Sequence, residues 1–168
     1  IVVRPTVSSP LVSQHNSIIG NTVLYGATAG TLLAAGQAGE RFAVRNSGAK
    51  VVVEGCGANG CEYMTGGTAV ILGPVGSNFG AGMTGGMAFI LDTDDQFERR
   101  ANGESIVWQR LASSHWEAVL KELVEDHARA TGSKWSAEVL ADWDRWRDRF
   151  WQVCPKEMLS RLSHSLNE

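Results

Sequence analysis

The sequence predicts a mainly β protein in which a parallel β-solenoid, with coils of about 19 residues, is followed by an α-helical tail. Three observations lead to this fold class. A repeat with an offset of 19 runs through the first half, 17 of the 19 glycines lie in residues 1–92, and all six tryptophans lie in residues 93–168. We therefore divide the chain into a glycine-rich solenoid domain, residues 1–92, and a helical C-terminal extension, residues 93–168.

The repeat is clearest where residues 57–72 are set against residues 76–91. Nine of these 16 pairs are identical. Chance would give about one, because each residue type makes up only several per cent of an average protein. In a solenoid, matching residues of successive coils stack about 4.8 Å apart, which brings Ile71 onto Ile90 and Leu72 onto Leu91. An antiparallel sandwich with glycine-rich turns is the alternative, but the constant offset argues against it.

Glycines mark the corners of the predicted coils, where the backbone turns and a positive φ is needed. We expect structural corner glycines at Gly48, Gly55, Gly57, Gly66, Gly67, Gly80, Gly82, Gly85 and Gly86. At one corner, Thr65 stands above Thr84 and Asn46 stands above both, which predicts a polar ladder.

The strand triplets predict an apolar column outside the coil. The weaker backward continuation of the repeat aligns Leu33, Val51, Val70 and Phe89. Because successive side chains of a strand alternate between faces, a triplet of apolar residues cannot be buried entirely inside the coil. We expect the outward column to form an apolar surface that meets another domain.

The chain begins directly with a strand, Ile1 to Val3, and no capping segment precedes it. Natural solenoid ends carry atypical caps that cover the open edge. We therefore expect the solenoid domain to be truncated at its N-terminal end, and the isolated chain to be able to associate with itself through that edge.

Helix signals dominate the extension. Ser114 followed by Glu117 matches a capping box, and apolar residues then recur at helical spacing until Gly132. A second helix is expected after Ser133.

Aromatic residues of the second helix share one apolar stripe, which includes Trp135 and Trp143. We expect Phe150 and Trp151 to continue that helical face and residues 156–162 to add one or two short turns. The tryptophans imply docking onto a large apolar surface. We expect the extension to pack on the outer column or to cap the C-terminal end of the solenoid.

Charge and composition limit the partners. The net charge is −3, with 15 basic and 18 acidic residues, so no cationic surplus favours a nucleic acid. No apolar run approaches the roughly 18 residues that a membrane span requires. The three cysteines contain no CxxC pair, which argues against a disulfide framework or a zinc site and is consistent with a cytoplasmic location.

The sequence contains only weak matches to motifs for catalysis or ligand binding. Residues 55–60 match GxGxxG, but a strand rather than a helix is expected to follow, so the context of a dinucleotide site is missing. Glu54 and Glu62 flank this corner and could pair as acid and base, although we favour hydrogen bonds to turn amides or contacts with Arg41 and Arg45. We assign no catalytic, cofactor-binding or metal-binding residue.

Long stretches of the sequence resemble one family. Residues 18–73, residues 78–92 (NFGAGMTGGMAFILD) and residues 127–158 resemble, in this order, the GXGXG domain and closing helical segment of the glutamate synthase large (α) subunit. The resemblance implies a right-handed β-helix within an enzyme that makes two glutamates from glutamine and 2-oxoglutarate. It also implies an amidotransferase domain and an FMN-binding synthase domain with a 3Fe–4S cluster elsewhere in the same polypeptide.

None of the family's catalytic or cofactor residues has a counterpart in this sequence, so the resemblance implies a structural, interdomain role. Residues near the predicted corners are then candidates for turn bonding or interdomain contact: Arg41, Arg45, Asn46, Glu54, Glu62, Tyr63 and Asn78. The alternative is a free-standing β-helix scaffold subunit similar to the glycine-rich subunit of formylmethanofuran dehydrogenase, whose resemblance does not extend to the helical tail.

Overall fold

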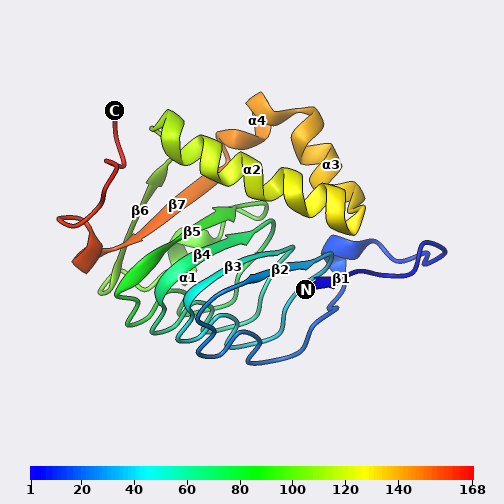
Figure 1. Cartoon of the computed structure of the whole chain (residues 1–168), viewed down its shortest axis with the longest axis horizontal. Helices are drawn as coiled ribbons and strands as arrows, with labels where there is room; N and C mark the ends of the chain where they lie inside the picture. The colour runs from blue at the N-terminus through cyan, green and yellow to red at the C-terminus, as the bar shows by residue number, and fades with distance from the viewer.

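The computed structural model describes all residues, 1–168, and consists of stacked coils with a helical layer on one side (Figure 1). In chain order the elements are β1 (Val2–Val3), η1 (Ser13–His15), β2 (Thr31–Ala34), β3 (Ser47–Val53), β4 (Thr65–Ile71), β5 (Gly85–Leu91), α1 (Phe97–Arg100), β6 (Ile106–Arg110), α2 (Ser114–Thr131), α3 (Lys134–Ala141), α4 (Trp143–Arg147), β7 (Phe150–Pro155) and η2 (Lys156–Met158). None of the helices is both long and apolar enough to cross a membrane.

The strands form one sheet in the order β1-β2-β3-β4-β5-β7-β6. Strands β1 to β5 follow each other in parallel, one per coil, and the rest of each coil consists of turns. This arrangement confirms the predicted β-solenoid and excludes the antiparallel sandwich.

The register of the coils differs from the predicted columns. Leu33 pairs with Val52 rather than with Val51, and Val52 pairs with Val70. The reason is a bulge in β3, where the register shifts between Ser47 and Lys50. One added residue in the strand changes its offset from the next coil, which a fixed repeat length cannot reveal.

The Asn46 side chain supports this bulge instead of joining a ladder with Thr65 and Thr84. Its amide nitrogen donates to the Ala49 carbonyl at 3.0 Å, and its oxygen accepts the Ala49 N–H at 2.9 Å. Asn46 is fully buried, whereas Thr65 and Thr84 are exposed. The prediction of a polar ladder at this corner is therefore wrong.

The extension is only partly helical. Helices α2 and α3 begin close to the predicted positions, but the residue that caps α2 is Ser113, whose side chain accepts the Trp116 N–H. Glu117 does not complete a capping box, because it binds Arg147 of α4 through two hydrogen bonds and accepts one from the Trp143 indole.

Phe150 and Trp151 begin strand β7 and do not continue a helix. Strand β7 pairs antiparallel with β5, and β6 pairs antiparallel with β7. The physical reason is that β5 would otherwise leave a full row of backbone hydrogen-bonding groups unpaired beside an apolar core.

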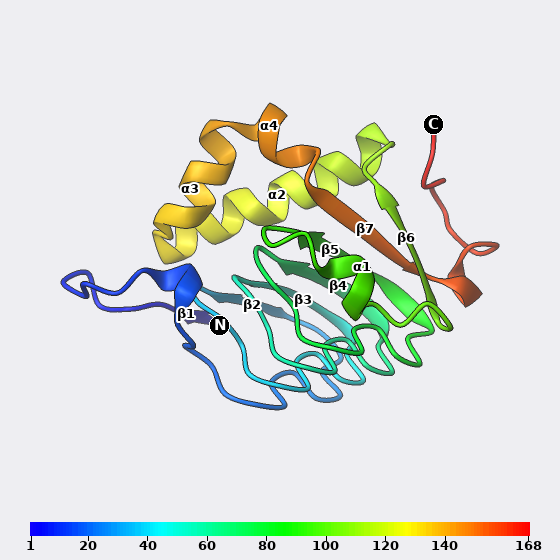
Figure 2. The same ribbon diagram turned by 180° about the vertical axis from the view of Figure 1, so that it is seen from behind.

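Two hydrophobic cores lie on opposite faces of the sheet. One fills the inside of the coils and includes Phe79 and Ile90. The other lies between the sheet and the helices, where Val70 and Phe89 pack with residues of α2 and α3. Figure 2 shows this helical layer across the outer face of the strands. The outward apolar column is thus covered by the chain's own helices and does not need another domain to bury it.

The close contact between successive coils leads to a first prediction, which concerns the stability of a glycine variant. A Cβ at Gly85 would lie 2.0 Å from the Thr65 carbonyl oxygen, which belongs to the backbone of the preceding coil and cannot move aside. We expect Gly85→Ala to lower the free energy of unfolding by about 1–3 kcal/mol or more, measured by urea denaturation.

Gly20→Ala is the matched control, because a Cβ there would meet nothing within 4 Å. We expect a change below about 1 kcal/mol. Equal stability of the two variants would contradict the proposed role of backbone contact.

Candidate functional site

The turns opposite the sheet contain an unusual backbone pattern. In each coil, alternate turn residues have positive φ, and most of them are not glycine: Thr22, Leu24, Arg41, Ala43, Arg45, Asn59, Cys61, Tyr63 and Asn78. A left-handed conformation costs an L-residue roughly 1–2 kcal/mol. Hydrogen bonds to neighbouring coils offset this cost, since the Arg41 N–H donates to the Ala58 carbonyl at 2.8 Å and the Cys61 N–H to the Phe42 carbonyl at 2.7 Å.

The glycines expected at corners fall into two groups. Gly67, Gly80, Gly82 and Gly86 have positive φ. The others, Gly48, Gly55, Gly57, Gly66 and Gly85, do not, but a Cβ at any of them would lie 2.0–2.9 Å from the nearest atom of a preceding coil.

The predicted contact residues do not gather in one site. Arg41, Arg45 and Tyr63 are exposed, Glu62 is half-buried, and none of them forms a salt bridge. Glu54 lies apart from them, fully buried beneath the helical layer. The structure therefore does not bring Glu54 to the two arginines.

Asn78 belongs to an asparagine ladder along one corner. Its amide nitrogen donates to the Asn59 side-chain oxygen at 3.2 Å, and its own oxygen accepts from the Asn102 amide at 2.9 Å. The ladder joins two coils to the segment before β6. The identity of Asn59 and Asn78 in the repeat is the signal that could have located it.

The buried polar side chain that joins the largest number of separate segments is Glu54, at the end of β3. Its Oε2 accepts a hydrogen bond from Ser133 at 2.5 Å and contacts His127 Nε2 at 2.9 Å, while its Oε1 accepts from Ser13 at 2.7 Å. Ser13 comes from η1, His127 from α2, and Ser133 is the N-cap of α3. One carboxylate thus ties the solenoid to three separate segments.

The geometry of this Glu54 cluster is structural and not that of a nucleophilic triad. In a triad the histidine takes the serine proton, with the carboxylate behind the histidine. Here the carboxylate lies in the centre, and the Ser133 hydroxyl donates to Glu54 instead of to His127. His127 Nδ1 has no hydrogen-bond partner.

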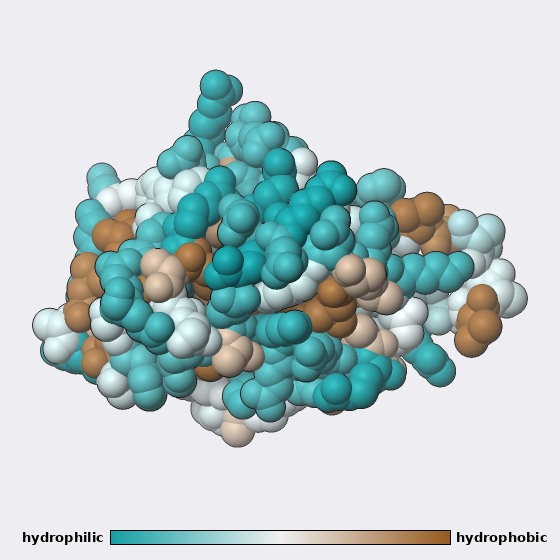
Figure 3. Space-filling model, turned by 90° about the horizontal axis from the view of Figure 1, so that it is seen from above, coloured by the Kyte–Doolittle hydropathy of each residue, from teal (hydrophilic) through white to brown (hydrophobic).

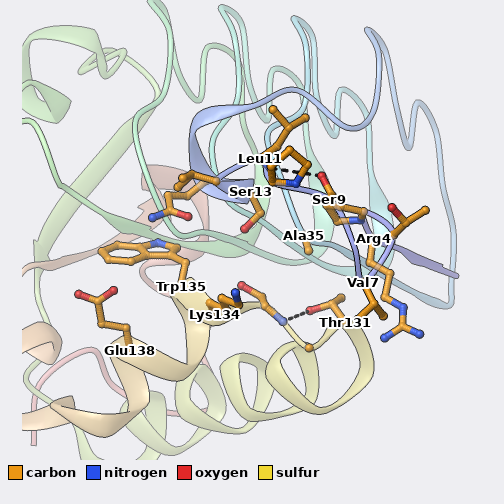
Figure 4. A pocket seen from close by; sticks show the side chains of 17 residues that line it. Arg4, Val7, Ser9, Leu11, Ser13, Ala35, Thr131, Lys134, Trp135 and Glu138 are labelled. Carbon is orange, nitrogen blue, oxygen red and sulfur yellow. Dashed lines mark hydrogen bonds between the residues drawn. The ribbon is translucent and has the colours of Figure 1, made fainter.

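A groove with a volume of about 480 Å³ lies beside the Glu54 cluster. Figure 4 shows Ser9, Leu11 and Ser13 along one wall and Thr131, Lys134 and Trp135 along the other. The first wall belongs to residues 4–13, which we call the N-terminal arm. Since the groove is open and lined largely by polar residues, it suits contact with another polypeptide segment better than enclosure of an apolar ligand.

The cysteines do not fit an iron–sulfur cluster. Cys56 and Cys61 lie in the core inside the coils, while Cys154 lies in the core on the opposite face of the sheet. Burial raises the pKa of Cys56 to about 12 and that of Cys154 to about 11, and burial also raises the pKa of Cys61. The thiols are therefore protonated at neutral pH, whereas metal ligation requires thiolates. No group of three or more His, Cys, Asp or Glu side chains could hold a metal ion.

Sequence reasoning missed the Glu54 cluster. The helical spacing of His127 from Leu123 and Val124 indicates that it is buried, but nothing in the sequence indicates its partner, which is 73 residues away. The serines carry no distinguishing pattern beyond the predicted helix start after Ser133.

Comparison with known proteins gives a consistent result. The family model described as GXGXG motif matches residues 1–156. The chain is 67% identical to the glutamate synthase [NADPH] large chain of Azospirillum brasilense over 162 residues, which cover 96% of this chain and 11% of that protein.

Similar stretches occur in relatives with other electron donors in their names. The ferredoxin-dependent glutamate synthase 1 of Arabidopsis thaliana is 50% identical over 92% of the chain, and the glutamate synthase [NADH] of Schizosaccharomyces pombe is 46% identical over 94%. The chain spans 10% and 7% of these two proteins.

The Glu54 cluster leads to a second prediction, which concerns the stability of Glu54 variants. Glu54→Gln turns an amide N–H₂ toward donors that need an acceptor, so we expect the free energy of unfolding to fall by about 1–3 kcal/mol. Glu54→Ala leaves Ser13, His127 and Ser133 without their acceptor and is expected to be more destabilising. Urea denaturation measures both.

Glu62→Gln serves as the control, because Glu62 is half-buried and forms no salt bridge. If Glu54→Gln proved as stable as this control, the carboxylate would not be the connection that we describe.

Proposed function

The chain belongs to the GXGXG motif family, and from this premise we propose that it is the C-terminal structural region of a glutamate synthase large chain. The parent enzyme would convert glutamine and 2-oxoglutarate to two glutamates. The observation that carries the proposal is the 67% identity over 96% of the chain to a glutamate synthase large chain.

The polar interior supports a structural role. The buried Glu54 carboxylate is engaged by Ser13, His127 and Ser133 of the same chain. The cysteines are protonated and lie in two separate cores. We infer that FMN and the 3Fe–4S cluster are held by other domains of the polypeptide, and that the chain itself contributes no catalytic group. A cytoplasmic location stays a prediction.

The relatives also support a role that does not depend on the electron donor. Proteins named for NADPH, for NADH and for ferredoxin share this stretch at 46–67% identity. A region common to all three is better suited to bracing the enzyme than to selecting its reductant. A free-standing scaffold subunit like that of formylmethanofuran dehydrogenase is not favoured, because the relatives are glutamate synthases.

The distribution of exposed apolar residues indicates which end meets the other domains. Of the eight large hydrophobic residues that are exposed, six lie in residues 1–25: Ile1, Val2, Val7, Leu11, Val12 and Tyr25. Figure 3 shows hydrophobic residues on the projecting N-terminal arm, with others at the opposite end of the molecule. We propose that the end with the N-terminal arm contacts the amidotransferase and FMN-binding synthase domains.

Five of the corner residues remain candidates for further interdomain contact: Arg41, Arg45, Glu62, Tyr63 and Asn78. Asn46 and Glu54 are fully buried and hydrogen-bonded within the chain, so we assign them internal bonding instead.

A variant of the N-terminal arm tests this proposal in the full-length large chain. Val7 and Leu11 are 94% and 61% exposed, so their replacement by Asp leaves the two cores of this region intact. We expect V7D/L11D to lower glutamine-dependent glutamate formation about fivefold or more, on the scale of energetically important interface residues. We also expect faster proteolysis near the arm.

Leu159→Asp is the control, since Leu159 is 45% exposed and lies far from the arm in the sequence. The interdomain proposal fails if V7D/L11D matches this control in both activity and protease resistance.

A further inference from the structure

The N-terminal arm is attached to the rest of the protein at its two ends. Before its first residue, the Val3 carbonyl accepts the Ala35 N–H at 2.9 Å beside the pairing of β1 with β2. At its last residue, the Ser13 hydroxyl donates to the buried Glu54 carboxylate at 2.7 Å. The two ends are thus fixed by the sheet and by the Glu54 cluster.

Between these ends, the backbone of the arm has free hydrogen-bonding groups. Residues 4–11 form two hydrogen bonds: the Ser9 N–H donates to the Thr6 carbonyl at 2.9 Å, and the Leu11 N–H donates to the Ser9 hydroxyl at 3.3 Å. Both bonds lie within the arm. The remaining backbone N–H and C=O groups are available to another polypeptide chain.

Hollows lie on both sides of the arm. The groove of about 480 Å³ separates the arm from the turn between α2 and α3, and a second hollow of about 290 Å³ separates it from residues 16–18 of the first coil. Arg4, Ser9 and Ala35 line both hollows, so the two adjoin each other along the arm. Since this path is long and open, an extended polypeptide segment fits it better than a compact molecule.

The charged side chains that line the groove are Arg4, Lys134 and Glu138. None of them forms a salt bridge within the chain. In Figure 4, Arg4 and Glu138 lie on opposite sides, with Lys134 between them, and Arg4 also lines the second hollow. The cationic end of the path is therefore the end at Arg4, where a carboxylate would gain a partner and avoid Glu138.

The Glu54 carboxylate lies behind the wall of the groove and faces donors of its own chain. It is fully buried, accepts hydrogen bonds from Ser13 and Ser133, and contacts His127. Because the Ser13 proton points to Glu54, the Ser13 oxygen can only accept a hydrogen bond from an occupant of the groove. A backbone N–H can donate this bond and a carboxylate cannot, so the acidic side chain of an occupant belongs at Arg4 and not at Ser13.

We propose that the groove along the N-terminal arm binds an extended segment of another domain of the parent large chain, with an Asp or Glu side chain of that segment at Arg4 and Lys134. The inference rests on the proposed function, which assigns interdomain contacts to this end of the molecule, and it adds the chemistry of the partner. The Arg4 guanidinium can bind a carboxylate through two hydrogen bonds, and Lys134 adds a second positive charge.

Photo-cross-linking in the full-length large chain tests the groove. Thr6 is exposed and lines both hollows, so Thr6→p-benzoylphenylalanine places a photoreactive group inside the path. We expect mass spectrometry to map its cross-link to a segment outside residues 1–168 that contains Asp or Glu. Val2→p-benzoylphenylalanine is the comparison, because Val2 is exposed at the same end of the molecule and lines neither hollow.

Charge variants test the role of the two cations. With the photoreactive group at position 6, we expect R4E/K134E to lower the yield of this cross-link about fivefold, which corresponds to the ~1 kcal/mol of one exposed ion pair. R99E/R161E is the matched control, since Arg99 and Arg161 are exposed, form no salt bridge and line neither hollow. Its yield is expected to equal that of the parent.

The outcomes separate the groove from the proposed function. A cross-link to another domain from position 2 but not from position 6 would overturn the groove and leave the interdomain contact standing, whereas no such cross-link from either position would contradict both. The groove proposal also fails if position 6 reaches a second copy of the chain or a segment without Asp or Glu, or if R4E/K134E gives the same yield as its control.

Discussion

Backbone contact between successive coils is the constraint on which the structure depends. Parallel strands must approach to about 4.8 Å for their ladder to form, and the turns on the other side of each coil must keep the same spacing. Glycine meets this demand where a side chain would strike the coil below, as at Gly66, whose Cβ would lie 2.2 Å from the Ser47 carbonyl oxygen. In the turns, alternate residues have a left-handed backbone conformation, and their N–H groups donate hydrogen bonds to carbonyls of neighbouring coils. These bonds keep the turns at the spacing of the strands.

Stacking then determines what the remaining residues must do. A sheet with apolar side chains on both faces needs two cores, and the coil can enclose only one of them. Helices α2 and α3 supply the other. The Glu54 carboxylate joins the two layers, because it leaves the end of β3 and reaches His127 of α2 and the N-cap Ser133 of α3. A group with this many buried donors fixes the position of the helices relative to the coils.

The stacked strands and the two main helices could be predicted from the sequence, but the strand register, strand β7 and the Glu54 cluster could not. The repeat predicted stacked strands because matching Ile and Leu residues recur at one offset, and the apolar spacing predicted α2 and α3. The register was missed, since a bulge in β3 changes the offset without changing the residue types. Strand β7 was missed because Phe150 and Trp151 fit a helix or a strand equally well in so short a segment. The Glu54 cluster depends on residues far apart in the chain, and no local pattern marks such a contact.

Because β7 runs antiparallel to β5, further coils could not be added to the solenoid beyond β5. A coil can be copied onto β1 or between two existing coils, because every strand from β1 to β5 runs the same way. Beyond β5 the chain reverses, and β6 with its bulky Trp108 forms the outer edge, so another 19-residue unit would find no matching template there. Whole coils could therefore be added only on the β1 side of β7, and the antiparallel pair β7 and β6 marks the fixed end of the sheet.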